Sequence, residues 1–454
     1  MDWIEKIKEE IGKESVLEEI ETRKIYSRDE SGMENFLCDC VVFPKNEKEI
    51  IKVLRIANEF KIPVTPRGGG TGVVGGAIPL KGGILLSLSK MNKIIDIDEK
   101  NFLIEVQPGV ILKKIYEEAQ KLNLFYPPDP ASFENCTIGG NVATNAGGPR
   151  CIKYGVTENY VLAIEGILPS SEKIYAGKKT RKWKAGYNLP KILIGSEGTL
   201  CIFTKIFLRL LPKPEYIETL IVPFEKKEEA SNSSFEMISN KIIPRCIEYV
   251  DESVFEIIGE EIRKFLPSKT RAFLLIEFDG DENEVNKNVQ KTLDILNKNR
   301  AIEIYAGIKD YEREKIWKIR RDILPSLEKT GYRVRSEDVC VPLKEINNLI
   351  GIFEEMKIKF PLKICLFGHI GDGNLHINFL WKEKDIEILN KAIYELYERV
   401  VSIGGTITGE HGIGILKRKY LKIEQDERVL NLQREIKKIF DPNNILNPGK
   451  IFME

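Results

Sequence analysis

The chain has 454 residues, and its 69 Lys and Arg residues are balanced by 69 Asp and Glu residues, so its formal net charge is zero. This balance gives no net field that would attract nucleic acid or anionic lipid. A hydrophobic content of 42% with a charged content of 30% is typical of a globular protein. The length suits two or three domains, and no apolar run is long enough to cross a bilayer.

The N-terminal residues predict an amphipathic helix rather than a targeting segment. Within residues 1–14, Trp3, Ile4, Ile7 and Ile11 recur at helical spacing among charged residues. The segment lacks the apolar stretch and the small-residue cleavage site of a signal peptide. We therefore expect a cytoplasmic protein, with peripheral attachment to the inner face of the membrane as the alternative.

Apolar periodicity predicts the next elements in chain order. The expected helices are 48–60 and 112–122, and the expected strands are 62–66, 84–88, 102–106 and 273–278. From about 215 to 400, long charged helices alternate with apolar strands, and glycine motifs return from Gly404 onward. These shifts predict a first domain over 1–212, a middle domain over 213–403, and a C-terminal segment over 404–454 that returns to the first domain.

The eight cysteines are spread through the chain, without a C-x-x-C pair or the clustered spacing of an iron–sulfur site. This distribution favours structural thiols in a reducing cytosol. Any iron–sulfur relay would therefore reside on another subunit.

A glycine motif at 70–75 reads Gly-Thr-Gly-Val-Val-Gly and matches the G-x-G-x-x-G fingerprint of nicotinamide dinucleotide sites. That fingerprint requires a helix to begin inside the motif, so that its N-terminus meets the pyrophosphate. Here Gly76, Pro79, Gly82 and Gly83 follow at once, and these residues disfavour a helix. The sequence therefore excludes a Rossmann site at this position.

Three glycine-rich segments nevertheless indicate a phosphate-containing cofactor. They read Arg-Gly-Gly-Gly-Thr-Gly at 67–72, Thr-Ile-Gly-Gly-Asn-Val-Ala-Thr-Asn-Ala-Gly-Gly at 137–148, and Gly-Ser-Glu-Gly-Thr-Leu at 195–200. A run of bare backbone amides can bind a phosphate without a helix. The alternative is a set of tight structural turns, but several long segments of this kind favour a long diphosphate cofactor.

The chain contains three histidines, and all three lie in glycine-rich segments. His369 and His376 belong to Gly-His-Ile-Gly-Asp-Gly-Asn-Leu-His, and His411 belongs to Thr-Gly-Glu-His-Gly-Ile-Gly. Two histidines seven residues apart, with Glu410 as a carboxylate, form a credible ligand set for zinc or another divalent metal with open positions. The alternative is that both histidines hold the substrate by hydrogen bonds without a metal.

The motifs together resemble a known family. With Pro-Asp-Pro at 128–130 and Lys-Tyr-Gly at 153–155, the glycine segments resemble the FAD domain of the vanillyl-alcohol oxidase superfamily. The histidine motifs resemble its FAD-linked oxidase C-terminal branch, which includes glycolate oxidase large subunits, D-lactate dehydrogenases and D-2-hydroxyglutarate dehydrogenases. The resemblance covers nearly the whole chain. It implies an α+β fold, with a two-subdomain PCMH-type FAD-binding domain and a ferredoxin-like α+β cap domain that has an antiparallel sheet.

The resemblance also implies the FAD-binding residues. Covalent attachment of the flavin through histidine is excluded, because no histidine lies in the N-terminal domain. One departure is visible: the family usually has glycine after Gly-Ser-Glu-Gly-Thr-Leu, and this chain has Cys201. The implied FAD-binding residues are Pro66, Arg67, Gly68, Gly69, Gly70, Thr71, Gly72, Pro130, Thr137, Gly139, Gly140, Asn141, Thr144, Asn145, Ala146, Gly147, Tyr154, Glu197, Gly198, Ile202 and Asn447.

The activity implied by the resemblance is oxidation of a D-2-hydroxy acid to the 2-oxo acid, with hydride transfer to flavin N5. His369, His376 and Glu410 match the positions at which related enzymes hold a zinc-type ion. Such an ion would lower the pKa of the substrate hydroxyl. His411 is the candidate base for the hydroxyl proton.

Two arginines are candidates for the substrate carboxylate. Arg320 matches the carboxylate-clamping arginine of the family, and the guanidinium fork suits bidentate binding. Arg335 matches a second basic position of the branch. The alternative for either residue is a solvated charge on a helix or loop.

Two other functions remain open at the level of sequence. One is a flavin-dependent synthase of the alkyl-glycerone-phosphate type, which catalyses no net redox change. The other is a catalytically silent FAD subunit of a larger complex. The sequence also leaves open which acid is the substrate and what the oligomeric state is, with a homodimer among the options. The electron acceptor is open as well, with an iron–sulfur subunit, an electron-transfer flavoprotein or a quinone as the candidates.

Overall fold

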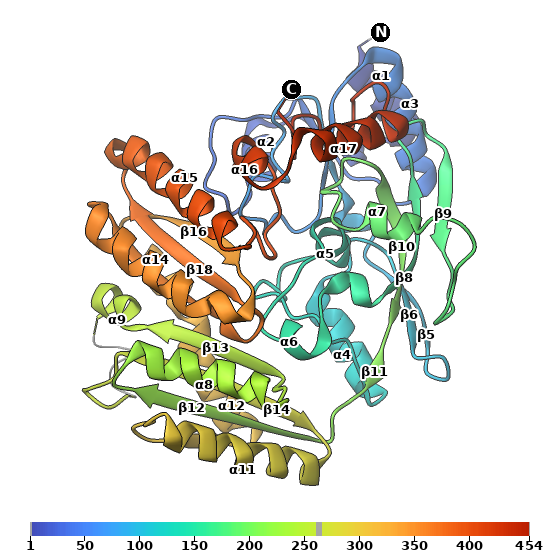
Figure 1. Cartoon of the computed structure of the whole chain (residues 1–454). Helices are drawn as coiled ribbons and strands as arrows, with labels where there is room; N and C mark the ends of the chain where they lie inside the picture. The colour runs from blue at the N-terminus through green and yellow to red at the C-terminus, as the bar shows by residue number, and fades with distance from the viewer. Residues whose placement is uncertain (1, 260–265, 454) are drawn as a thin grey trace. The chain divides into compact units, whose positions relative to one another are not determined.

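The computed structural model describes residues 2–259 and 266–453, and the chain divides into two compact units (Figure 1). Unit 1 comprises Met1–Ala146, Val156–Lys213 and Glu410–Glu454, and unit 2 comprises Gly147–Gly155 and Pro214–Gly409. Unit 2 thus includes a short segment of the N-terminal chain, Gly147–Gly155, called the excursion below. The sequence patterns did not predict this grouping. The domain boundaries at 212 and 403 stay a prediction.

The strands of unit 1 form two main sheets and a short ribbon. They are β1 (Val16–Leu17), β2 (Cys40–Val42), β3 (Val64–Arg67), β4 (Ile84–Ser87), β5 (Ile94–Asp98), β6 (Leu103–Val106), β7 (Leu124–Phe125), β8 (Val161–Ile167), β9 (Lys173–Gly177), β10 (Ile202–Arg209) and β11 (Leu211–Pro212). The first sheet has the order β1-β2-β4-β3, with β4 parallel to both β2 and β3. The second has the order β5-β6-β10-β8-β9 and is antiparallel, and β11 pairs with β7.

The helices of unit 1 include the predicted amphipathic N-terminal helix. They are α1 (Trp3–Ile11), α2 (Ile20–Tyr26), α3 (Glu47–Phe60), α4 (Leu112–Lys121), α5 (Ile138–Thr144), α7 (Leu189–Leu193), α16 (Leu421–Glu424) and α17 (Glu427–Phe440). The Asp2 side chain caps α1 by accepting a hydrogen bond from the Ile4 N–H. Ile7 and Ile11 are buried and pack with apolar residues of α3 and the first sheet, as their helical spacing predicts.

The glycine-rich stretch between β3 and β4 contains no helix. Since both strands and the whole loop lie in the described part of the chain, this observation confirms that the G-x-G-x-x-G match at 70–75 is not a Rossmann site. The predicted helices at 48–60 and 112–122 are also confirmed as α3 and α4.

Unit 2 is built on one seven-stranded sheet. Its strands are β12 (Tyr216–Phe224), β13 (Cys246–Asp251), β14 (Ala272–Gly280), β15 (Tyr305–Gly307), β16 (Arg333–Cys340), β17 (Lys363–His369) and β18 (Asn374–Trp381). Their order is β15-β12-β14-β13-β17-β18-β16, and every neighbouring pair is antiparallel. The expected mixed α+β fold with an antiparallel sheet is therefore confirmed.

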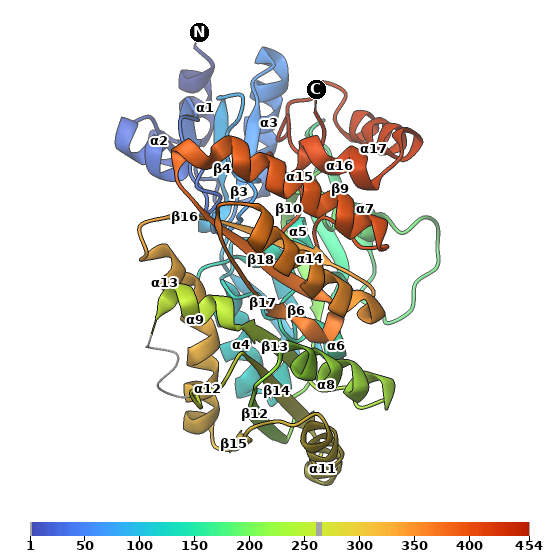
Figure 2. The same cartoon turned by 60° about the vertical axis from the view of Figure 1, so that its left-hand side comes forward.

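Helices cover both faces of this sheet (Figure 2). They are α6 (Cys151–Tyr154), α8 (Lys227–Ser239), α9 (Glu252–Ile258), α11 (Glu282–Lys298), α12 (Asp310–Arg321), α13 (Ile323–Glu328), α14 (Ile346–Lys359) and α15 (Ile386–Ser402). One apolar cluster joins alternate residues of β13, β14 and β17 to α9, α12 and α13, so these helices share a face. Helices α8, α11, α14 and α15 lie on the opposite face.

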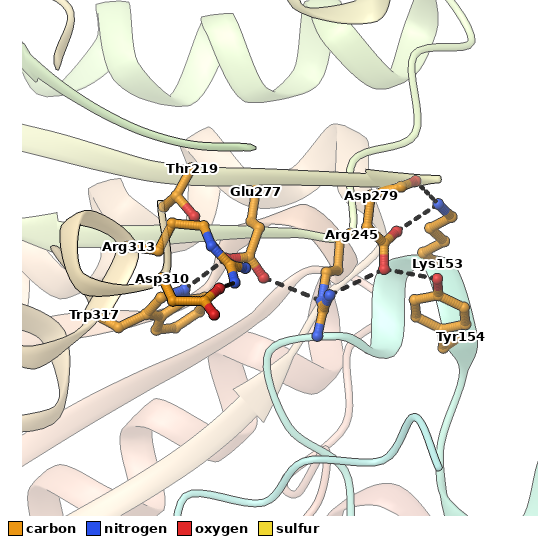
Figure 3. A network of polar contacts seen from close by, with 9 residues as sticks. All are labelled: Lys153, Tyr154, Thr219, Arg245, Glu277, Asp279, Asp310, Arg313 and Trp317. Atoms are coloured by element: carbon orange, nitrogen blue, oxygen red, sulfur yellow. Dashed lines mark hydrogen bonds and ion pairs between the residues drawn. The ribbon is translucent and has the colours of Figure 1, made fainter. Parts of the chain in front are cut away.

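A buried polar network crosses the sheet of unit 2, and Figure 3 shows its members. At one end, Asp279 of β14 receives hydrogen bonds from Lys153 Nζ at 2.6 Å, Tyr154 Oη at 2.8 Å and Arg245 Nη1 at 3.1 Å. Lys153 and Tyr154 belong to α6, so these contacts hold the excursion Gly147–Gly155 against the sheet.

The other end of the network is centred on Glu277, which precedes Asp279 by two residues and therefore points to the same face of β14. Arg245 Nε lies 3.0 Å from Glu277 Oε1. Oε2 accepts hydrogen bonds from Thr219 Oγ1 at 2.6 Å and from Trp317 Nε1 at 2.8 Å. Arg245 and both carboxylates are at most 5% exposed, so the arginine bridges two desolvated negative charges. Trp317 connects α12 to this network.

Candidate functional site

The first glycine segment of unit 1 packs directly on the second. A Cβ atom at Gly69 would overlap the carbonyl oxygen of Asn135 and lie 3.2 Å from its carbonyl carbon. A Cβ atom at Gly68 would overlap Thr137 Oγ1. Only glycine permits this approach of two backbones. The two segments that the sequence assigns to one cofactor are therefore neighbours in unit 1.

A cavity of about 700 Å³ opens at this junction. Arg67, Gly68, Gly69 and Thr137 line it, together with residues of 25–26, 87–92, 109–118 and 134–135. Its volume lies within the range of small-molecule sites, about 300–1,000 Å³. Backbone amides of glycine beside a guanidinium are suitable donors for phosphate oxygens. The residues present thus fit the diphosphate-containing part of a dinucleotide.

Several residues of the second glycine segment have local structural tasks. Thr137 caps α5 by accepting a hydrogen bond from the Gly140 N–H at 3.3 Å. Asn145 ends α5 with φ of 53°, in the left-handed region that asparagine tolerates. A Cβ atom at Gly139 would lie 2.6 Å from Pro108 Cβ. The turn hypothesis therefore accounts for these residues, and their contact with a cofactor stays a prediction.

Glu197 holds the loop that follows His411. Its carboxylate accepts hydrogen bonds from the Ile413 N–H at 2.7 Å and the Gly414 N–H at 2.8 Å. Burial raises the pKa of Glu197, and the two backbone N–H groups oppose that rise. The amide of Asn447 donates to the Glu197 carbonyl at 2.8 Å. Glu197 and Asn447, both predicted to bind FAD, therefore organise the surrounding loops of unit 1.

The remaining predicted cofactor residues fall in different environments. Gly198, with φ of 68°, faces Pro66, since a Cβ atom there would lie 2.7 Å from Pro66 Cγ. Ile202 is 1% exposed and belongs to the core of unit 1. Gly147 and Tyr154 lie in the excursion that groups with unit 2. A contact of these residues with FAD stays a prediction.

A tight hairpin of unit 2 brings His369 and His376 together. His369 ends β17, and the chain returns through Gly373, whose φ is 85°, to His376 on β18. The two imidazole rings are 5.2 Å apart at an angle of 88°. His376 lies opposite Phe367 in the β17–β18 register and stacks on its ring at 5.9 Å. The proximity that the seven-residue spacing allows is thus realised.

Sequence reasoning missed Glu248, which joins two predicted site residues. Glu248 lies on β13 and is 0% exposed. Its Oε1 is hydrogen-bonded to His369 Nδ1, and its Oε2 accepts from Arg320 Nε at 2.7 Å. The Arg320 guanidinium also lies over the ring of Phe367 at 4.6 Å. The only signal in the sequence is a carboxylate within an apolar strand, where acidic residues are rare unless they are paired.

Burial alone would raise the pKa of Glu248, but the neighbouring His369 and Arg320 lower it and outweigh burial. The pKa is lowered from 4.5 to about 2. Glu248 is therefore a carboxylate acceptor for both partners at neutral pH.

Arg335 lies on β16, at the edge of the same sheet. Its Nε lies 2.5 Å from Glu337 Oε1, and Glu337 is 0% exposed. Arg335 is thus partly buried in an ion pair rather than solvated.

Glu410 follows directly on Gly409, the last residue of unit 2. The Gly409 N–H donates to Asp338 Oδ2 at 3.0 Å, and Asp338 lies opposite His376 in the β16–β18 register. The peptide bond therefore keeps Glu410 near His376. One ligand atom from each of His369, His376 and Glu410 lies within 4.8 Å of the other two. Ligand atoms about 2 Å from one zinc ion are about 3–4 Å apart, so these three groups are a candidate ligand set.

His411 is the next residue after Glu410, and its Nε2 lies 3.8 Å from Glu410 Oε1. The side chain is largely buried, with 17% exposed. The chain itself therefore keeps the candidate base next to the carboxylate of the candidate ligand set.

Comparison with known proteins identifies the family. The description "FAD linked oxidases, C-terminal domain" matches residues 213–451, and "FAD binding domain" matches residues 38–175. The chain belongs to the FAD-linked oxidase family. This FAD-linked oxidase has the FAD-binding domain that its glycine segments predict, and the predicted family is confirmed.

Among its curated relatives, the FAD-linked oxidase is 38% identical to glycolate oxidase subunit GlcD of Bacillus subtilis, over 95% of this chain and 92% of that protein. It is 38% identical to D-lactate dehydrogenase of Archaeoglobus fulgidus, over 92% and 91% of the two chains. It is 34% identical to D-lactate dehydrogenase of Anaerostipes hadrus, over 99% and 97%.

Solved structures share the fold of this FAD-linked oxidase at low identity. p-Cresol methylhydroxylase superposes with a TM-score of 0.81 at 18% identity, over 100% of this chain and 96% of that chain. Alkyldihydroxyacetonephosphate synthase superposes with a TM-score of 0.77 at 20% identity, over 98% and 84%. These likenesses establish the fold and leave the substrate undecided. No helix among the described residues is long and apolar enough to cross a membrane.

Proposed function

We propose that this FAD-linked oxidase oxidises a D-2-hydroxy acid, of the glycolate, D-lactate or D-2-hydroxyglutarate type, to the 2-oxo acid. The observation that carries this proposal is the grouping of His369, His376 and Glu410, with Arg320 joined to His369 through one buried carboxylate. The names of the curated relatives, glycolate oxidase subunit and D-lactate dehydrogenase, support the same class of substrate.

FAD would be held without a covalent bond. The Arg67–Thr71 loop and the glycines that follow Thr137 would receive its diphosphate, since Arg67, Gly68, Gly69 and Thr137 line the cavity of unit 1. When bound, FAD supplies the acceptor for the hydride of the substrate carbon. The other predicted FAD-binding residues would complete the site.

His369, His376 and Glu410 would hold a divalent metal, with zinc or a similar ion as the candidate. Two imidazoles and a carboxylate leave a coordination position open, which is the pattern of a catalytic rather than a structural site. When bound, such an ion lowers the pKa of a coordinated hydroxyl group.

His411 would accept the hydroxyl proton of the substrate, since imidazole changes its protonation state near neutral pH. Arg320 would bind the substrate carboxylate through its terminal nitrogens, because its contact with Glu248 is made by Nε. Arg335 is a second candidate for this task, although its Nε is engaged by Glu337.

Electrons would leave the reduced cofactor to a partner. The word "subunit" in the name of the glycolate oxidase relative supports a partner protein, such as an iron–sulfur subunit, with an electron-transfer flavoprotein or a quinone as the other candidates. We place this reaction in the cytoplasm or at the inner face of the membrane.

The first experiment adds D-lactate, glycolate and D-2-hydroxyglutarate in turn to the anaerobic, FAD-loaded protein and follows the visible absorbance. We expect one acid to bleach the flavin band. If none does, the redox reaction is refuted and a non-redox synthase or a silent FAD subunit takes its place. In His411→Asn we expect the flavin band to persist and its reduction to slow by about 10²–10⁴-fold.

Arg320→Met tests the carboxylate site, with Arg321→Met as the matched control. Both residues lie on α12, and Arg321 is paired with the exposed Glu314. Loss of a charged hydrogen bond to the substrate costs about 2–4 kcal/mol, so we expect Arg320→Met to lower kcat/KM by about 30–1,000-fold. Arg321→Met should stay within about twofold. Equal effects of the two substitutions would remove Arg320 from this task.

A further inference from the structure

Glu248 lies on β13 between two residues of the candidate site, and the inference about it rests on the proposed function. We infer that Glu248 is a positioning residue, which holds His369 as the Nδ1–H tautomer for metal binding and anchors Arg320 at the same time. Glu248 acts through these two partners. The inference concerns side chains of unit 2 alone.

Strand register places Glu248 beside His369. Tyr249 pairs with Gly368 and Val250 pairs with Phe367 in the antiparallel β13–β17 ladder. The next position of this register sets Glu248 opposite His369. Directly opposed residues of antiparallel strands point to the same face of the sheet, about 4.5–5.5 Å apart at their Cβ atoms. The contact is therefore a consequence of backbone pairing, and side-chain rotation alone does not create it.

The two oxygens of Glu248 have different donors. Oε1 faces His369 Nδ1, and Oε2 accepts from Arg320 Nε at 2.7 Å. A carboxylate can only accept, so the neutral imidazole beside it must carry its proton on Nδ1. The lone pair of that tautomer is on Nε2, which is the nitrogen left for a metal. A carboxylate that orients a ligating histidine in this way commonly raises metal affinity by about 10–100-fold.

Burial makes the arrangement rigid. Glu248 is 0% exposed, His369 is 6% exposed, and the Arg320 side chain is 13% exposed. Phe367 precedes His369 by two residues on β17, so the two side chains point to the same face. Its ring contacts the Arg320 guanidinium at 4.6 Å and the His376 ring at 5.9 Å. One phenyl ring and one carboxylate thus hold both histidines and the arginine in fixed relation to one another.

A glutamine at this position cannot replace the carboxylate. Its amide has one acceptor atom and one donor group, whereas His369 Nδ1–H and Arg320 Nε–H both need an acceptor. If the amide oxygen faces His369, its NH₂ group opposes the Arg320 Nε–H. If the amide is reversed, its NH₂ group faces Nδ1, and the imidazole proton moves to Nε2, where it blocks a metal. The first orientation leaves the Arg320 Nε–H without an acceptor, and the second removes the His369 tautomer that can bind a metal.

The chain provides a matched control in Glu277. This residue is 3% exposed, lies on the neighbouring strand β14, and also contacts α12, through Trp317. Its partners Thr219, Arg245, Arg313 and Trp317 include no histidine. Glu277→Gln should therefore disturb packing against α12 without changing the tautomer of His369.

The first measurement requires no variant. Because the chain has three histidines, ¹⁵N-histidine labelling of the metal-free, FAD-loaded protein gives at most three imidazole spin systems. Their nitrogen shifts report which nitrogen carries the proton, and loss of one signal in His369→Gln assigns that signal. We expect the neutral His369 ring to carry its proton on Nδ1. A proton on Nε2 in the wild-type protein would overturn the inference even if Glu248→Gln failed to fold.

The second measurement titrates Co²⁺ into the same protein and follows the visible d–d bands. We expect Glu248→Gln to weaken Co²⁺ binding by about 10–100-fold and Glu277→Gln to change it by less than about threefold. Equal binding by wild type and Glu248→Gln would refute the inference while leaving the metal site in place. If the wild-type protein bound no Co²⁺, the metal of the proposed function would be refuted instead, and the His369 tautomer would still decide the task of Glu248.

Discussion

Replacing Arg245 by methionine should destabilise unit 2 more than any exposed charge substitution. Arg245 is 4% exposed and bridges Glu277 and Asp279, which are 3% and 5% exposed (Figure 3). Methionine fills a similar volume but leaves both carboxylates without their shared cation. Breaking a buried ion pair by removing one partner costs about 3–5 kcal/mol, because the remaining charge is desolvated and uncompensated.

The structure places the expected cost near the lower end of that range. Asp279 keeps its hydrogen bonds from Lys153 and Tyr154, and Glu277 keeps those from Thr219 and Trp317. We therefore expect a loss of about 3 kcal/mol. For a domain of 150–250 residues, 1 kcal/mol lowers the Tm by about 2–4 °C, so the transition of unit 2 should fall by roughly 6–12 °C.

The assay is thermal unfolding of the FAD-free protein, followed by calorimetry and by tryptophan fluorescence, since Trp317 belongs to the network. Two probes are needed because two units need not unfold together. The control is Arg271→Met. The Arg271 side chain is 64% exposed, and its Nη1 lies 3.5 Å from Glu252 Oε1. We expect that substitution to change the stability by less than about 0.5 kcal/mol. If the two variants unfolded within 1 °C of each other, the argument from buried charge would be refuted.

Two further predictions concern unit 1. Gly69→Ala should lower FAD affinity by about tenfold or more, because its methyl group would overlap the Asn135 carbonyl, whereas Gly351→Ala, which meets no atom within 4 Å and lies outside the predicted FAD site, should retain FAD in equilibrium dialysis. Burial lowers the pKa of Lys450 from 10.5 to about 8. Between pH 8 and 10.5 the unfolded chain therefore binds more protons at Lys450 than the folded protein does, so the free energy of unfolding rises with pH. From pH 8 to 9.5 the FAD-free wild type should gain about 1.5 kcal/mol of urea-unfolding free energy relative to Lys450→Met; a pH-independent difference would show that Lys450 is not the source.

Local sequence patterns were sufficient for the family and for most single elements. The order of the glycine segments identified the FAD-binding domain, and helical or alternating periodicity located α3, α4 and β14. Helix-breaking residues after Gly75 also excluded a Rossmann site, and no helix follows β3 there. These features depend on neighbours in the chain, which the sequence displays directly.

Contacts between distant segments were decided by the tertiary structure. Glu248 and His369 are separated by 121 residues, and Arg320 and Glu248 by 72. Both contacts follow from the order of strands in the sheet and from the register of β13 with β17, which composition and periodicity do not specify. The excursion Gly147–Gly155 and its attachment to Asp279 have the same origin.

By itself, the sequence determined which chemical groups are available: three histidines in two glycine-rich segments, and amide-rich segments suited to a diphosphate. The tertiary structure decided which partner each group has. It gave His369 a buried carboxylate, gave Glu197 the backbone amides after His411, and gave Arg245 two anions. The physical reason is that hydrogen bonding and desolvation depend on distances in space, and these are set by strand pairing and burial.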